Sequence, residues 1–410
     1  MPFFDFIRVA IFYTDKSRVL CRRSRSVNSG IVKMKYKSIV TGAMFALAAV
    51  AFSGCEKVLL SPAGEDLPAI PLSDVATLLA GLPLSGEQLG EVYDASSSSA
   101  ANGYDEEYTM RDLFREPGAG VGDVAGTSTK AYGRPLRDLI REAVMATKAT
   151  DGEAWLETLS SSDIQIYWPY SENWDGESMP IVTFDPGDDM PLNEAYDVHG
   201  NKILVTEEMA AERPVWVINR NQDAEYTTLE MMRREDPSWG SGGGDIVVTK
   251  AASETKTLVL KSFTAKRNFD SWFAGGSEFW VKIGAVEDFT ASTEAELRLY
   301  DPQITDFMIV VRRKQVGEVL PFNAVLVSDW TDQLYSCALM IVEDDGGTQT
   351  SWKASCTVKY NSKSYGIDLE IPLRTRDDIV WRGSLSKDYI DRHSGETGHF
   401  GDVDLVFDFL

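Results

Sequence analysis

Acidic side chains gather near the ends of predicted strands in the C-terminal part of the chain, where they could bind a metal ion. Calcium takes about six to eight hard oxygen ligands, so clustered carboxylates suit it. The alternative interpretation is a set of acidic turns that only face water. The candidate ligands for calcium are Asp270, Glu278, Glu343, Asp344 and Asp345.

The stretch from Asn268-Phe269-Asp270 to Ser277–Lys282 resembles calcium-dependent membrane-binding β-sandwich domains of the protein-kinase-C type. In that family, loop carboxylates at one end of the sandwich bind calcium, so the resemblance implies the same use here. It covers a short part of the chain. Ser277-Glu278-Phe279 stands where Ser-Asp-Pro-Tyr is usual, and the later loop has no clear Asp-x-Asp.

A second candidate metal site is the histidine segment near the C-terminal end. His393 and His399 flank Glu396, and a histidine with a carboxylate is a common zinc-ligand combination. However, the segment lacks the His-Glu-x-x-His spacing that places both imidazoles on one face of a helix. The alternative is a mobile loop, because two glycines interrupt the segment.

Two cysteines, Cys337 and Cys356, are candidates for a disulfide bond. Gly346-Gly347 is a hairpin turn signal, and a two-residue loop there would place the two cysteines directly opposite each other. An exported protein could oxidise them. The alternative is that both are small buried core residues.

The N-terminal residues carry the pattern of an export signal that ends at Cys55. Three lysines between residues 33 and 37 precede an uncharged, mostly apolar run over 39–52, as in secretory signal peptides. Phe52-Ser53-Gly54-Cys55 resembles the lipobox of bacterial lipoproteins, with Phe52 where leucine is commoner. The resemblance implies cleavage before Cys55, lipidation of its thiol and anchoring by acyl chains. A short buried helix with a chance cysteine is the alternative, and Met34 is the expected true start.

The charge of the chain limits its partners. The net charge is −23, and residues 1–54 hold nine Lys/Arg and two Asp/Glu, so the chain from Cys55 onward has a net charge of −30. Such acidity argues against nucleic-acid binding, which depends on Lys and Arg at phosphates. It is typical of a solvated surface that keeps a protein soluble. The sequence contains no Gly-x-Ser-x-Gly, phosphate loop or dinucleotide fingerprint, so no catalytic residue is predicted.

These residues must be positioned by a multidomain α+β fold. The sequence pattern predicts a signal peptide (1–54), a tether (55–67), a helical region (68–160), a small β unit of about five strands (161–222), a linker (223–244) and an antiparallel β-sandwich of about eight strands (245–410). Residues 105–114 are expected to be helical and residues 95–102 to form a flexible loop. In the sandwich, alternation is clearest over 365–371 and 403–409.

The functional prediction is a lipid-anchored outer-membrane protein that binds a protein or glycan ligand without catalysis. As a whole, the chain resembles uncharacterised lipoproteins of gut-type Gram-negative bacteria, a resemblance that implies a location and no activity. The alternatives are a hydrolase acting on an envelope or extracellular polymer and a calcium-dependent structural module. A deep pocket with converging carboxylates between the small β unit and the sandwich would favour the hydrolase.

Overall fold

The structure is a computed structural model that describes residues 69–115, 132–148, 150–187, 190–221, 226–235 and 255–410. The predicted signal peptide, Cys55, the tether and much of the linker lie outside these residues. The α+β class and the C-terminal β-sandwich are confirmed. The division into several domains is not confirmed, because Leu67–Leu410 form one compact unit.

The first part of this unit, residues 69–221, is called the α/β region here. Its helices are α1 (Leu72–Ala80), α2 (Gly86–Ala101), α3 (Met110–Leu113), α4 (Leu136–Thr147), α5 (Gly152–Ser161) and α6 (Glu207–Glu212). Its strands are β1 (Glu107–Thr109), β2 (Ile164–Tyr167), β3 (Ile181–Phe184), β4 (Leu192–Tyr196), β5 (Lys202–Thr206) and β6 (Val215–Arg220). They form one sheet in the order β1-β2-β6-β3-β4-β5, in which β3 and β6 are parallel and the other pairs are antiparallel.

Both faces of β6 are buried, which agrees with its continuous apolar run. Trp216 and Ile218 lie in a core with α1, α2, α4 and α5. Val215 and Val217 belong to a second core, which also contains Phe273 from the sandwich. Helices α1, α2, α4 and α5 therefore cover one face of the sheet, whereas α6 and part of the sandwich cover the other.

Two local predictions in the α/β region are wrong. Residues 95–102 are not a loop, because α2 continues to Ala101 and buries the small side chains of Ala95, Ser96 and Ser99. Residues 105–114 do not form one helix, because β1 pairs with β2 before α3 begins. In both cases tertiary packing decides the outcome rather than the local composition.

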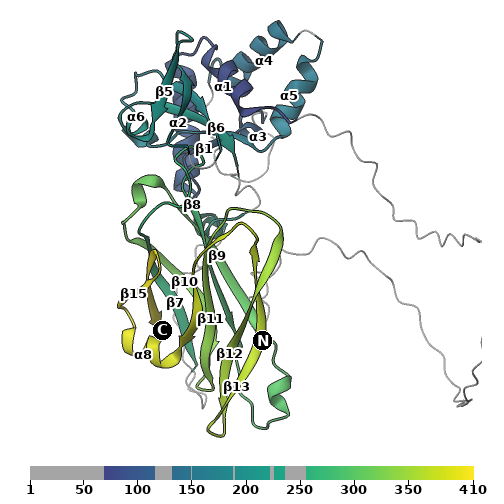
Figure 1. Ribbon diagram of the computed structural model, residues 1–410, viewed down its shortest axis with the longest axis vertical. Coiled ribbons are helices and arrows are strands. Elements are labelled where there is room, and N and C mark those ends of the chain that lie inside the picture. The colour runs from purple at the N-terminus through teal and green to yellow at the C-terminus, as the bar shows by residue number, and fades with distance from the viewer. Residues whose placement is uncertain (1–68, 116–131, 149, 188–189, 222–225, 236–254) are drawn as a thin grey trace, which may run out of the picture. The chain divides into compact units, whose positions relative to one another are not determined.

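Ten strands of the described residues form the sandwich (Figure 1). They are β7 (Lys256–Ala265), β8 (Ser277–Ala285), β9 (Gln303–Val311), β10 (Leu320–Trp330), β11 (Leu334–Glu343), β12 (Gln349–Tyr360), β13 (Lys363–Arg374), β14 (Asp378–Ser386), β15 (Thr397–Phe400) and β16 (Val403–Phe409). One sheet has the order β10-β7-β16-β15. The other has the order β13-β12-β11-β8-β9, with β14 also paired to β11. Short helices α7 (Leu229–Glu235) and α8 (Lys387–His393) accompany these sheets.

The predicted hairpin register is found at one pair, Ser336 with Thr357, but the predicted two-residue loop and long pairing are wrong. The connection between β11 and β12 covers residues 344–348 rather than two residues, although Gly346 and Gly347 do have the positive φ angles of a tight turn (71° and 97°). The two strands pair only near Leu334 and Ser336. From Ala338 to Glu343, the edge of β11 that begins beside β12 pairs with β8 instead. The opposite edge of β11 pairs with β14, a strand that the sequence did not predict.

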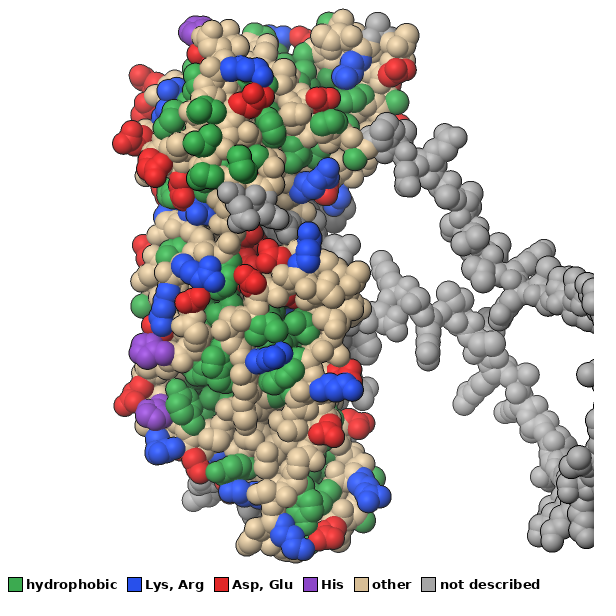
Figure 2. Space-filling model, in the orientation of Figure 1, with side chains coloured by type: hydrophobic (Ala, Val, Ile, Leu, Met, Phe, Trp, Pro, Cys, Tyr) green, Lys and Arg blue, Asp and Glu red, His purple; other side chains and the backbone are tan. Residues whose placement is uncertain are grey.

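The surface of the described residues is mixed in character. Figure 2 shows Asp and Glu side chains spread over the visible face and interspersed with Lys and Arg, so the acidity is not gathered into one patch on that face. Among the described helices, none has the length and apolar character that crossing a bilayer requires.

Candidate metal centre

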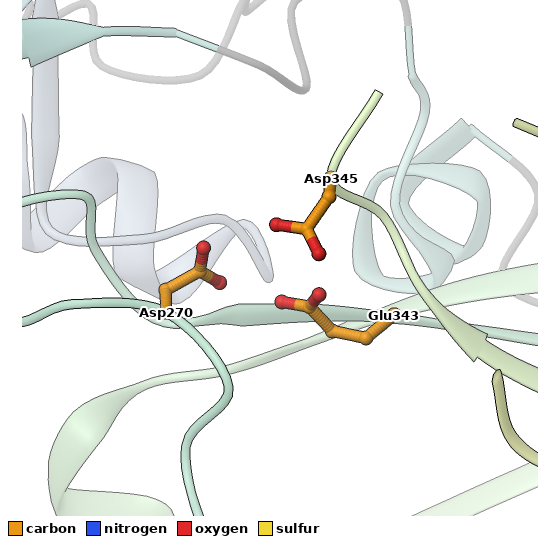
Figure 3. Close-up of side chains that lie close together, drawn as sticks. All are labelled: Asp270, Glu343 and Asp345. Atoms are coloured by element: carbon orange, nitrogen blue, oxygen red, sulfur yellow. The ribbon is translucent and has the colours of Figure 1, made fainter. Parts of the chain in front are cut away.

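Three of the five predicted calcium ligands meet at one end of the sandwich. Asp270, Glu343 and Asp345 each offer a carboxylate oxygen, and these atoms lie within 4.8 Å of one another. Their carboxylates point toward one another (Figure 3). We call these three residues the carboxylate cluster. Asp270 comes from the β7–β8 loop (residues 266–276), Glu343 ends β11, and Asp345 lies in the loop that follows.

Strand β11 places Glu343 in the interior. Successive side chains of a strand point to opposite faces, so Glu343 shares a face with Cys337, Leu339 and Ile341, all of which are fully buried. The strand pairs with β8 on one side and β14 on the other, where Glu343 lies opposite Phe279 and Asp378. The carboxylate of Glu343 therefore lies in the interior of the sandwich, away from solvent.

The buried oxygens of the cluster lack hydrogen-bond donors. Glu343 is 0% exposed. Among the described residues, no donor hydrogen-bonds to either of its carboxylate oxygens or to Oδ2 of Asp270, which is also buried. Burying an ionised carboxylate without a partner is costly, so such a group either takes up a proton or meets a cation.

The pKa values of Glu343 and Asp270 indicate the first alternative, in which a buried carboxylate takes up a proton. Burial raises the pKa of Glu343 to about 11, and the neighbouring carboxylate of Asp270 raises it further. Burial also raises the pKa of Asp270, against the opposing effects of Glu343 and Arg313. Without a cation, a proton on Glu343 can bridge the two carboxylates. A divalent cation could replace that proton, because all of the donors are hard oxygens.

The other two predicted ligands lie elsewhere. Asp344 follows the last residue of β11 and lies outside the cluster. Its carboxylate accepts hydrogen bonds from Nε1 of Trp280 (3.1 Å) and the backbone N–H of Gly346 (2.9 Å), and it pairs with Arg374 (3.3 Å).

Glu278 lines a small cavity between the α/β region and the sandwich. The volume is about 10 Å³, which suits about one water molecule. The other lining residues are Asp105, Glu107, Gln165, Arg220, Asp270 and Ala274. Carboxylates converge at this cavity, but it is far smaller than the pocket that an enzyme needs for a polymer substrate.

Sequence reasoning missed two residues that hold Asp270 in place. The Arg313 guanidinium Nη1 donates to the backbone oxygens of Asp270 and Gly275, at 3.2 Å each. Asp105, from the α/β region, accepts the backbone N–H of Gly276 at 2.6 Å. The three consecutive basic residues Arg312–Lys314 were the available signal, although their partners are distant in sequence.

The histidine segment does not form one metal site. His393 ends α8 and His399 lies in β15, so the segment is not a mobile loop. Nδ1 of His393 lies 2.9 Å from Glu396, while Nδ1 of His399 lies 2.7 Å from Asp404. Within the described residues, the carboxylate cluster is the one group of three metal-ligating side chains whose ligand atoms lie within 4.8 Å of one another.

The two cysteines are free, buried thiols in the structure. The recorded pairing of β11 with β12 stops at Ser336 and Thr357, one residue short of the two cysteines, and on the other edges of these strands Cys337 pairs with Leu385 of β14 and Cys356 with Ile367 of β13. Burial raises the pKa of both thiols, to about 11 for Cys356.

Comparisons with protein-family models, with curated proteins and with solved structures gave no match for this chain. The site is therefore interpreted from its own geometry.

Proposed function

We propose that this protein is a lipid-anchored cell-envelope protein that binds a ligand without catalysing a reaction, and that its sandwich contains a calcium ion at the carboxylate cluster. The observation that carries the calcium site is the fully buried Glu343, whose two oxygens lack donors among the described residues and lie beside Asp270 and Asp345. The anchoring part of the proposal depends on the lipobox-like sequence at Cys55.

Calcium suits this cluster better than magnesium or zinc. The donors are carboxylate oxygens, with no imidazole or thiolate among them, so the set does not favour zinc. Magnesium keeps several waters and requires near-octahedral geometry, which a buried Glu343 makes difficult. Calcium accepts irregular coordination and bidentate carboxylates, and backbone carbonyls and water can supply its remaining ligands.

The cavity at Glu278 provides no specific observation in favour of the hydrolase alternative. Its volume of about 10 Å³ leaves no room for a sugar ring or a peptide. A binding function with a structural cation therefore remains the better-supported proposal.

Calcium titration of the metal-stripped chain tests the site. Residues 56–410 contain the whole compact unit Leu67–Leu410 and omit the predicted lipidation site. Calorimetry should give one calcium site, and free calcium at 100 times its Kd should raise the free energy of unfolding by about 2.7 kcal/mol. The absence of both binding heat and a rise in melting temperature would overturn the site.

Metabolic labelling tests the anchor. In a Gram-negative host, the full chain should incorporate a palmitate analogue and fractionate with membranes, whereas the Cys55→Ala variant should do neither. Equal labelling of both chains would exclude lipidation at Cys55.

A further inference from the structure

The β7–β8 loop connects the carboxylate cluster to the α/β region. Two residues after Asp270, the loop buries Trp272 and Phe273, which are 4% and 0% exposed, in the core on one face of the α/β sheet. Nε1 of Trp272 also donates to the backbone oxygen of Pro191 at 3.3 Å. The β7–β8 loop therefore provides one carboxylate of the cluster and two apolar side chains that pack against the α/β sheet.

Hydrogen bonds hold the backbone of the same loop to the α/β region. Asn219, on β6, donates from Nδ2 to the backbone oxygens of Phe273 (3.1 Å) and Ala274 (2.6 Å). The backbone N–H of Gly276 donates to Asp105. Gly276, the last residue of the loop in these bonds, lies only six positions after Asp270. A displacement of Asp270 should therefore disturb these bonds.

Several acidic side chains lie close together at this loop. Asp105 lines the same small cavity as Asp270 and accepts the backbone N–H of Gly276, and Glu343 and Asp345 lie beside Asp270. Like charges at such separations repel one another. Arg313 contacts this loop, but it also forms an ion pair with Glu207 through two hydrogen bonds. A divalent cation would reduce this repulsion and hold Asp270 directly.

We propose that a cation at the carboxylate cluster acts as a latch: by binding Asp270, it holds the β7–β8 loop in place and so fastens the α/β region to the sandwich. The proposal rests on the calcium site proposed above and adds what that ion controls. By thermodynamic reciprocity, a loop that is docked on the α/β sheet should also bind calcium more tightly.

Hydrogen exchange of residues 56–410, with calcium or with a chelator, tests the latch. Calcium should slow exchange about tenfold or more over the β7–β8 loop and β6. Exchange over the β12–β13 hairpin (349–374) should change little, because that hairpin takes no part in the contact.

A variant outside the cluster tests reciprocity. Asn219→Ala removes two hydrogen bonds to the loop without removing a carboxylate, and it should weaken calcium binding roughly fivefold or more. Asn193→Ala is the matched control, because its side-chain amide donates to Phe184 within the α/β sheet itself (2.8 Å). The control should bind calcium like the parent chain.

The outcomes separate the two proposals. If the parent chain binds no calcium, the proposed function fails and the latch fails with it. If calcium binds but leaves exchange at the loop and β6 unchanged, the latch is wrong and the calcium site stands. If Asn219→Ala proves too unstable to purify, the exchange experiment on the parent chain still decides the matter.

Discussion

Glu343 is the residue whose replacement distinguishes a cation site from an ordinary buried carboxylate pair. A glutamine side chain is nearly isosteric with a protonated glutamate and could donate to Asp270, so the Glu343→Gln chain should stay folded without metal. It should lose the rise in melting temperature that calcium causes, because one charge and one ligand are gone. Asp344→Asn is the control, since Asp344 lies outside the cluster. A calcium shift that survives Glu343→Gln would place the ion elsewhere.

The two buried thiols lead to a prediction about reactivity. Only the thiolate reacts readily, and burial raises the pKa of both Cys337 and Cys356. A water-soluble thiol reagent should therefore label neither cysteine in the native chain and both after unfolding, as read by mass spectrometry. Rapid labelling of the native chain would contradict the buried positions of these residues.

Glu91 provides a prediction about pH. This buried residue of α2 accepts the backbone N–H of Leu136 at 2.6 Å, at the start of α4, and burial raises its pKa above the usual 4.5. The folded state thus holds the proton more tightly than the unfolded state, so the contribution of Glu91 to stability is full below pH 4.5 and decreases as pH rises through the raised pKa.

The Glu91→Gln variant removes this titration. Its melting temperature relative to the parent chain should rise as the pH increases above 4.5, measured by differential scanning fluorimetry in a matched buffer series. Parallel curves for the two chains would show that the carboxylate of Glu91 does not titrate in this range.

At the level of elements, the run Arg312–Lys314 between β9 and β10 contacts the α/β region through ion pairs. Arg313 is mostly buried and pairs with Glu207, whereas Lys314 is about one-third exposed where it pairs with Glu172 at 2.6 Å. Arg313→Ala should lower the free energy of unfolding by about 2 kcal/mol, because it removes several charged hydrogen bonds.

Lys314→Ala is the matched control for Arg313→Ala. It should cost about 0–1 kcal/mol, as exposed ion pairs do. Urea unfolding measures both changes in the free energy of unfolding. Equal decreases for the two variants would mean that the burial of Arg313 adds nothing to stability.

Elements with a clear period could be predicted from the sequence, and elements defined by packing could not. The alternation of Tyr365, Ile367, Leu369 and Ile371 predicts β13, and that of 403–409 predicts β16. Strand β14 lacks such alternation because much of it is exposed. The polar serines of α2 predict a loop. In the structure, several of them pack as small residues in a helix that begins with a capping box at Ser85.

The same distinction applies to the site. A group of acidic residues at strand ends was within reach of the sequence. Which of them meet was not, because Asp344 and Asp345 follow the end of β11, where strand alternation no longer applies. The meeting of Asp270 with Glu343 depends on β11 lying beside β8 in the sheet order. No local signal indicates which strands become neighbours across about seventy residues.

At the level of the whole molecule, cooperativity should depend on calcium. The α/β region and the sandwich each have their own core, and the β7–β8 loop joins them through Trp272 and Phe273. Differential scanning calorimetry of residues 56–410 should show one transition with calcium and two with a chelator, since weaker contacts between the regions allow each to unfold separately. A single transition in both conditions would contradict this expectation.

The end of the described chain lies against the start of the sandwich. Thr257 and Leu410 exchange two backbone hydrogen bonds, of 3.0 Å and 2.9 Å, and β16 runs antiparallel to β7 from there. A tensile force applied between these two residues would load the backbone bonds one after another, like the opening of a zipper, and not all together in shear. Under mechanical pulling between these points, the sandwich should therefore yield at low force and peel from this edge, whatever its resistance to heat.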